Sequence, residues 1–158
     1  MYFIFINRNG IYKGYEDYAY VYRGGIIMDK YKIMVKGIVQ YEDKYLLVER
    51  WYDDRIVNPY QWEFIDGKLE FGELPEKGVI NIIQENTGLS VQINRILYTW
   101  SFMVGDVCNI GITFLCLSSQ DDVILSENLN EYKWVLKDEI GNYIENKNIL
   151  SDIDRAEL

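Results

Sequence analysis

The sequence predicts an α/β fold in which a mixed β-sheet lies between helices, preceded by a β-rich extension. Two observations support this fold class: short apolar, strand-like stretches recur along the chain, and helical patterns cover 75–87 and 147–158. With 158 residues, of which 49% are hydrophobic, the chain can bury the core of one main domain. We expect an N-terminal extension, residues 1–32, followed by an α/β domain, residues 33–158.

The extension begins with an apolar segment, Tyr2–Ile6, that reads as a strand. The Asn-Gly signal within Asn7–Gly10 predicts a turn. Three tyrosines at alternate positions in 18–22 would share one face of a strand, which Gly24 and Gly25 then end. These tyrosines could form a dimer surface, cover a sheet edge, or pack against the domain's own sheet.

The first half of the α/β domain reads as strands and loops. Ile33–Val39 and Tyr45–Glu49 are predicted to pair around a polar turn. A loop over Trp51–Tyr60 follows, and then a short strand, Trp62–Phe64. Gly67–Glu73 is rich in glycine and charge, which predicts a loop.

The second half begins with a helix that Pro75 starts and that runs to about Thr87, where Gly88 caps it. Two long strands follow, and the apolar run Asn109–Leu117 within the second is typical of a central strand. The remaining predicted elements are strands at Val91–Phe102, Val107–Leu117 and Tyr132–Leu136, a short helix from Lys137, and a helix over Lys147–Leu158.

Composition excludes several functions. The net charge of −9 would repel a nucleic-acid backbone, so no nucleic-acid polymer is expected as a partner. No apolar run approaches the length of a membrane span and no secretory signal is present, so we expect a cytoplasmic protein. Cys108 and Cys116 lie eight apart in one strand and are expected to be reduced thiols. Because the chain has no histidine, carboxylates, tyrosines, lysines or water would carry any acid–base chemistry.

Residues 67–89 read G-K-L-E-F-G-E-L-P-E-K-G-V-I-N-I-I-Q-E-N-T-G-L and resemble the Nudix box, G-x5-E-x7-R-E-U-x-E-E-x-G-U, where U is aliphatic. The resemblance covers residues 33–145 and implies the Nudix α/β/α sandwich. It also implies a hydrolase of nucleoside diphosphates linked to another group, with Mg²⁺ or Mn²⁺ as cofactor. The box positions that match are Gly67, Glu73, Ile83, Glu85, Gly88 and Leu89.

The departures from the box fall on its chemical positions. Asn81 stands where the family has Arg, Ile82 stands at the position of the usual base, and Asn86 replaces a metal-binding Glu. Positions 82, 85 and 86 share one helix face, where three carboxylates would converge on a hard cation. Ile82 can neither bind metal nor accept a proton, and Asn86 offers only a neutral oxygen. We therefore expect hydrolysis to be lost or greatly weakened. In the family, the Arg at position 81 pairs with the box Glu at position 73, so Asn81 is expected to leave Glu73 without this partner.

The resemblance still nominates site residues. No catalytic base is assigned, because Ile82 occupies its position. Glu85, the Gly67 carbonyl and Glu70 are the candidate metal ligands, and a nucleotide-like small molecule is the expected ligand. The candidates for substrate binding are Arg50, Trp62 and Glu131, and the structural box residues are Glu73 and Gly88.

Two other functions fit the same residues. A working hydrolase would need carboxylates such as Glu70, Glu131 or Glu139 within reach of Glu85 to replace the missing ligands. A non-catalytic interaction module would instead dimerise through residues 1–32.

Overall fold

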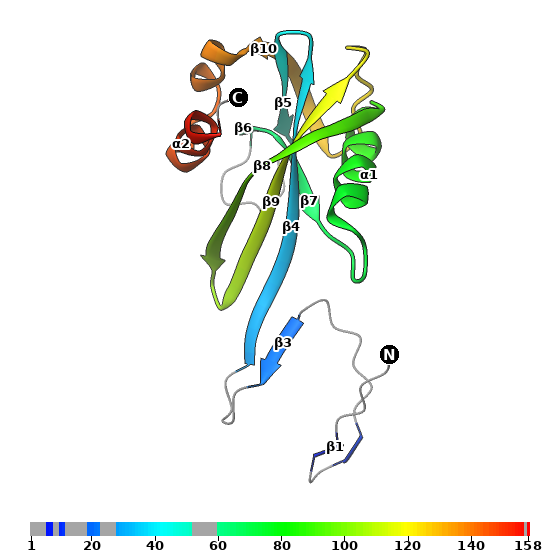
Figure 1. Cartoon of the computed structure of the whole chain (residues 1–158), viewed down its shortest axis with the longest axis vertical. Coiled ribbons are helices and arrows are strands. Elements are labelled where there is room, and N and C mark those ends of the chain that lie inside the picture. The colour runs from blue at the N-terminus through cyan, green and yellow to red at the C-terminus, as the bar shows by residue number, and fades with distance from the viewer. Residues whose placement is uncertain (1–5, 8–9, 12–18, 23–27, 52–59, 157) are drawn as a thin grey trace.

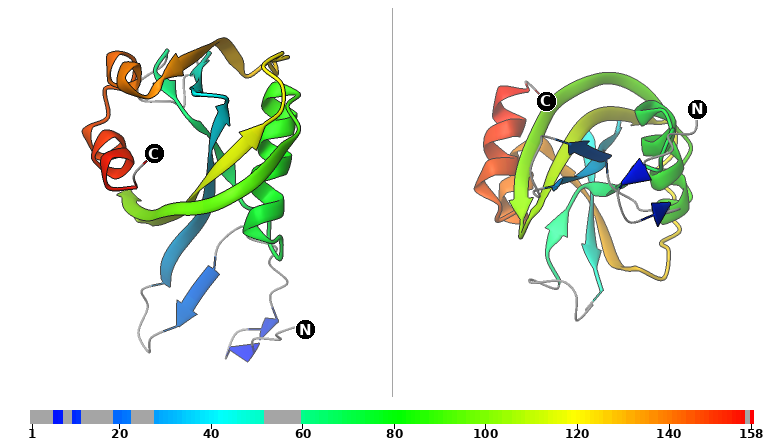
Figure 2. Two further views of the ribbon diagram at one scale, coloured as in Figure 1. Left: turned by 45° about the horizontal axis from the view of Figure 1, so that its top comes forward. Right: turned by 90° about the horizontal axis from the view of Figure 1, so that it is seen from below.

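The computed structural model describes residues 6–7, 10–11, 19–22, 28–51, 60–156 and 158. A mixed sheet of eight strands has one helix, α1, on one face, and a 3-10 helix, η1, and a second helix, α2, on the other (Figures 1 and 2). The bounds are β1 Ile6–Asn7, β2 Gly10–Ile11, β3 Ala19–Tyr22, β4 Met28–Tyr41, β5 Lys44–Arg50, β6 Trp62–Glu63, β7 Ile65–Lys68, α1 Pro75–Thr87, β8 Val91–Val104, β9 Val107–Ser118, β10 Leu129–Leu136, η1 Lys137–Asn142 and α2 Lys147–Arg155.

The main sheet has the strand order β10-β5-β4-β9-β8, and β3, β6 and β7 pair with β4, β5 and β4 respectively. Strands β4 and β9 run parallel, and the other pairs are antiparallel. Because β4 and β9 are parallel, the chain between them must return to the same end of the sheet through a crossover, and this crossover includes α1. This crossover places the helix of the box against the middle of the sheet.

Alternate residues of β4 point into two separate cores. Val35 and Val39 face α1 and pack with its buried residues Val79 and Ile83. Ile38 faces the opposite side, where side chains of η1 and α2 pack over it. This alternation buries the central strand on both faces, as an α/β/α sandwich requires. None of the helices in the described residues is both long and apolar enough to cross a bilayer.

The local signals at the ends of α1 are confirmed. The helix begins at Pro75 and ends at Thr87, and Gly88 follows in the left-handed conformation with φ of 70°. The strands predicted around Val107–Leu117 and Tyr132–Leu136 are also present, each slightly longer than expected. The C-terminal helix ends at Arg155 instead of Leu158.

Two predictions about the strands before α1 were wrong. Gly67 and Lys68 belong to β7, not to a loop. Strands β4 and β5 pair only beside their turn, through Gln40–Tyr45 and Tyr41–Lys44. Further along, β7 pairs with β4 from Met34 to Gly37, and it occupies the side that β5 was expected to take.

The N-terminal extension is described in part. Asn7 pairs with Gly10 in the β1–β2 hairpin, which agrees with the predicted turn. Strand β3 covers part of the tyrosine segment and pairs with β4. The predictions for residues 2–5, for Tyr18, for Gly24 and Gly25, and for most of the 51–60 loop lie outside the described residues.

Both cysteines lie in β9 as free thiols, Cys116 buried and Cys108 partly exposed. Burial raises the pKa of Cys116 to about 12, so its sulfur stays protonated near neutral pH and is a poor nucleophile.

Gly111 in β9 is required by its neighbour across the sheet. It pairs with Trp100 of β8, and a Cβ on Gly111 would run into the indole ring. The ring is also held from its polar edge, because Trp100 Nε1 donates to Thr113 Oγ1 at 3.1 Å. The indole therefore lies against the backbone of β9.

We expect Gly111→Ala to lower the free energy of unfolding by about 1–3 kcal/mol, because the new methyl group must displace the ring. The same change in a Trp100→Ala background should cost clearly less, since the obstructing ring is gone. Chemical denaturation of the four chains measures this coupling. Equal losses in both backgrounds would contradict the proposed contact.

Candidate functional site

Helix α1 approaches the sheet at two glycines. A Cβ on Gly37 of β4 would lie 2.6 Å from Ile83 Cδ1, and one on Gly67 of β7 would lie 2.8 Å from Ile82 Cδ1. The Ile82 side chain therefore rests on the Gly67 backbone and packs against the core beneath α1. Gly67 is a candidate metal ligand through its carbonyl, so the aliphatic Ile82 side chain contacts one of the residues predicted to hold a cation.

Asn86, on the next turn of α1, is held in structural hydrogen bonds. Its Nδ2 donates to the Ile82 carbonyl at 2.8 Å, and its Oδ1 accepts from Ser126 Oγ at 3.1 Å. The Ser126 amide also donates to the Asn86 carbonyl at 3.0 Å, and Ile124 N donates to Thr87 O at 2.9 Å. The Asn86 side chain thus fastens the segment before β10 to the end of α1.

Asn81 keeps the brace that the sequence predicted to be lost. Its Nδ2 donates to Glu73 Oε1 at 3.0 Å, and Glu73 Oε2 accepts from the Glu70 amide at 3.3 Å. The prediction was wrong because an amide reaches the same carboxylate that an arginine would reach in the family. Gly78 allows this loop to lie close, since a Cβ there would collide with Leu69 and approach Glu73. Gly78 therefore permits the close approach of α1 to the box loop.

The carboxylates that could hold a metal ion are not gathered at one place. Glu85 and Glu70 are exposed. Glu131 is also exposed and lies 3.6 Å from Lys133 Nζ, and Glu139 Oε2 accepts from the Leu136 amide at the start of η1. In the described part of the chain, no three Asp, Glu or Cys side chains are gathered closely enough to hold a metal ion. The described residues therefore do not fit a site for Mg²⁺ or Mn²⁺ of the family's kind.

Arg50 is engaged within the chain. Its guanidinium bonds Glu63 through Nε and Asp66 Oδ1 at 2.7 Å, and Asp66 also lies 3.6 Å from the buried Lys36. Burial would lower the pKa of Arg50, but the two carboxylates raise it above its usual value. Burial and the nearby Asp66 raise the pKa of Glu63, and Arg50 only partly offsets them.

The sequence reasoning missed this ion-pair network. The available signal was Lys36 itself, the one charge within the segment Ile33–Val39, because a lysine in such an apolar run needs a buried partner. That partner is Asp66, its cross-strand neighbour in β7.

Trp62, the other substrate-binding candidate, is partly buried by aromatic and cationic neighbours. It meets Tyr143 edge-on at 5.6 Å between centroids, and Lys133 Nζ lies 4.5 Å from its ring. Trp62 therefore joins β6 to η1 and β10, and this packing accounts for its position without a ligand.

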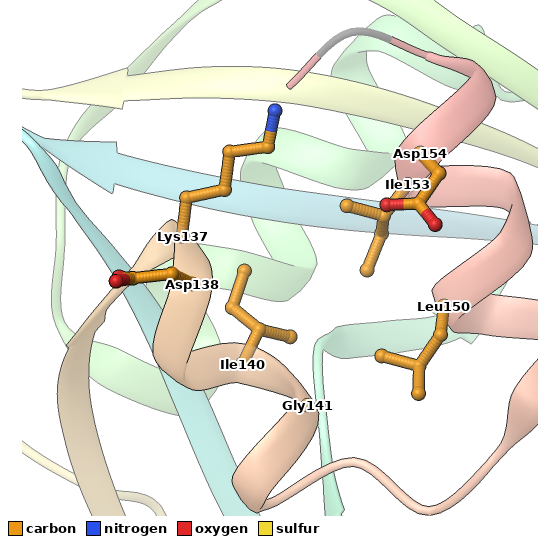
Figure 3. A pocket seen from close by; sticks show the side chains of 7 residues that line it. All are labelled: Lys137, Asp138, Ile140, Gly141, Leu150, Ile153 and Asp154. Atoms are coloured by element: carbon orange, nitrogen blue, oxygen red, sulfur yellow. The ribbon is translucent and has the colours of Figure 1, made fainter.

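A cavity of about 480 Å³ lies between η1 and α2, on the side of the sheet opposite α1 (Figure 3). Ile140, Leu150 and Ile153 surround its apolar part, and Lys137 and Asp154 lie nearby. None of its lining residues was predicted as a site residue.

The mixed sheet and a box helix seated on Gly67 define a chain with the Nudix α/β/α fold. No family model matches the chain. It is 27% identical over 124 residues to the nucleoside triphosphatase NudI of Escherichia coli, covering 71% of this chain and 86% of that protein.

Solved Nudix structures agree with this comparison. The MutT protein of Methanosarcina mazei superposes with a TM-score of 0.71 at 25% identity, covering 80% of this chain and 93% of that one. A Caenorhabditis elegans Ap4A hydrolase gives 0.68 at 15%, covering 80% and 95%. The Nudix domain of Shewanella oneidensis NrtR, complexed with ADP ribose, gives 0.64 at 18%, covering 79% and 85%. These similarities show the Nudix fold and support the Nudix family that the box resemblance predicted.

The tie between Asn86 and Ser126 can be measured directly. We expect Asn86→Ala and Ser126→Ala to show a coupling free energy of about 0.5–1.5 kcal/mol, the usual net contribution of one hydrogen bond. A double-mutant cycle by chemical denaturation provides the value. If the two losses add without coupling, the side chains do not bond in solution.

Glu63 should make stability depend on pH. Its pKa is raised above 4.5 in the folded chain, so ionisation of Glu63 favours the unfolded state as pH rises above 4.5. The neutral variant Glu63→Gln should therefore gain stability relative to the parent chain between pH 4 and neutrality. Denaturation midpoints across this range measure the difference, and a constant or falling difference would contradict the assignment.

Proposed function

We propose that this Nudix-fold protein binds a nucleotide-like small molecule and has lost, or retains only weakly, the metal-dependent hydrolysis of its family. The box helix and its loop support binding, since the Asn81–Glu73 bond and the seat on Gly67 preserve their structure. The replacement of the usual base by Ile82 and of a metal-binding Glu by Asn86 supports the loss of hydrolysis.

The contact between Ile82 and Gly67 carries the proposal. A divalent cation at this place would need charged oxygen ligands in its first shell, and the aliphatic side chain brings none. Relative to the family pattern, Ile82 and Asn86 together remove two negative charges. The Asn86 oxygen is already bonded to Ser126, and this leaves Glu85 as the carboxylate of that helix face.

The relatives suggest the class of ligand. NudI is a nucleoside triphosphatase, the worm protein is an Ap4A hydrolase, and the NrtR domain was solved with ADP ribose. All three compounds combine a nucleoside with linked phosphates. A compound of this kind is therefore the proposed ligand, and the free thiols of Cys108 and Cys116 support a reducing, cytoplasmic location.

The test combines binding and turnover on the whole chain. Calorimetry with nucleoside di- and triphosphates, Ap4A and ADP ribose, each with Mg²⁺ or Mn²⁺, should detect binding to at least one compound. Phosphate or nucleotide release should stay at the protein-free rate or far below the roughly 1 s⁻¹ of ordinary enzymes. Glu85→Gln should leave any residual release unchanged.

Restoring the box provides a matched variant. The triple change Asn81→Arg, Ile82→Glu, Asn86→Glu should raise metal-dependent release by at least about 100-fold, the usual contribution of a positioned base. Its circular dichroism and melting curve establish that it folds. Release by the parent chain at enzyme-like rates, abolished by Glu85→Gln, would instead identify a working hydrolase with relocated ligands.

A further inference from the structure

Strand β8 ends the main sheet, and among the described strands none pairs with its outer side. It is 14 residues long, well beyond the typical strand of about five or six residues. Its second half extends with β9 and β4 away from the helices (Figure 1). An edge of this length exposes backbone donors and acceptors that can pair with another chain.

The two halves of β8 differ in how this edge is protected. The first half has register shifts at Ile93–Arg95 and at Ile96–Tyr98, which bend the strand. It also carries the charge of Arg95, whose guanidinium donates to the Ala156 carbonyl beyond α2 at 3.4 Å. Bulges, charges and a covering helix are the devices by which proteins prevent pairing at an edge.

The second half, Thr99–Val104, has none of these devices. It pairs with β9 in continuous register and contains no proline and no charged residue. Phe102, Met103 and Val104 are 54%, 61% and 59% exposed, and consecutive residues of a strand present both of its faces. On one face, Trp100 and Phe102 stack at 5.4 Å and make a flat aromatic surface beside the edge.

The geometry points to a second copy of this chain as the partner of the β8 edge, with Thr99–Val104 of the two copies paired antiparallel into one continuous sheet. Electrostatics favour this segment for self-association, because two chains of charge −9 repel each other and it carries no charge of its own. Antiparallel pairing of identical strands is isologous, so each copy supplies the hydrogen-bond partners for the same backbone groups of the other.

The strand at the opposite end of the strand order, β10, is protected from such pairing. Strand β10 has a bulge between Leu129 and Glu131 and carries the charges of Glu131 and Lys133. These features protect β10 from pairing. A contact confined to six residues is smaller than the roughly 800 Å² per partner of standard specific interfaces. A weak dimer that forms only at high protein concentration is therefore expected.

Sedimentation velocity of the whole chain from about 1 to 300 µM tests the proposal. The parent chain should reach the mass of two copies, with amides of Thr99–Val104 gaining protection from hydrogen exchange as concentration rises. Met103→Lys and Ser101→Lys each place like charges across the pair and should weaken association at least tenfold. Ile96→Lys, an equally exposed position in the protected half, is the matched control and should dimerise like the parent chain.

Melting curves establish that each variant folds. If Met103→Lys does not fold, Ser101→Lys decides the outcome. A parent chain that stays monomeric at 300 µM would overturn the proposal. So would a mass that grows beyond two copies, or Lys variants at 101 and 103 that dimerise as well as the control. None of these outcomes bears on hydrolysis, so the proposal stands or falls separately from the proposed function.

Discussion

The seating of α1 on the sheet is the contact on which the rest of the structure depends. Gly37 and Gly67 remove side chains from β4 and β7, so the helix can press Ile83 and Ile82 directly onto the backbone. With α1 at this distance, Asn81 reaches Glu73 of the box loop at one end, and Asn86 reaches Ser126 at the other. Contacts made by the helix therefore position both loops beside it.

This arrangement explains how a Nudix fold persists when the box loses its charges. A carboxylate pressed against Gly67 would be partly desolvated, which is costly unless a cation or several donors compensate it. Ile82 removes that requirement and adds apolar burial to the core beneath α1. Asn86 likewise satisfies its own amide within the chain. Two of the three chemical positions of the family, Ile82 and Asn86, thus take part in internal contacts of the chain, and Glu85 stays exposed.

The sequence was sufficient where the signal is local. Pro75 and Gly88 mark the ends of α1 because each acts on the backbone of its own residue. The sequence was not sufficient for contacts between segments that are distant along the chain. No local pattern shows that Asn81 spans to Glu73, that β7 displaces β5 from β4, or that Arg50 meets both Glu63 and Asp66. The partners of Arg50 lie 13 and 16 residues further along the chain, too far for a local pattern to indicate them.

The charges on the face opposite α1 limit where a ligand can bind. Lys36 and Arg50 face Asp66 and Glu63, so two cations are balanced by two carboxylates in a partly buried network. An anionic phosphate approaching Arg50 would have to displace a carboxylate already bonded to it, and would leave that carboxylate without its partner. Removing one partner of a partly buried ion pair is unfavourable. Recognition of a nucleotide-like compound through Arg50 would therefore have to rearrange the network that joins β5, β6 and β7, and this role of Arg50 stays a prediction.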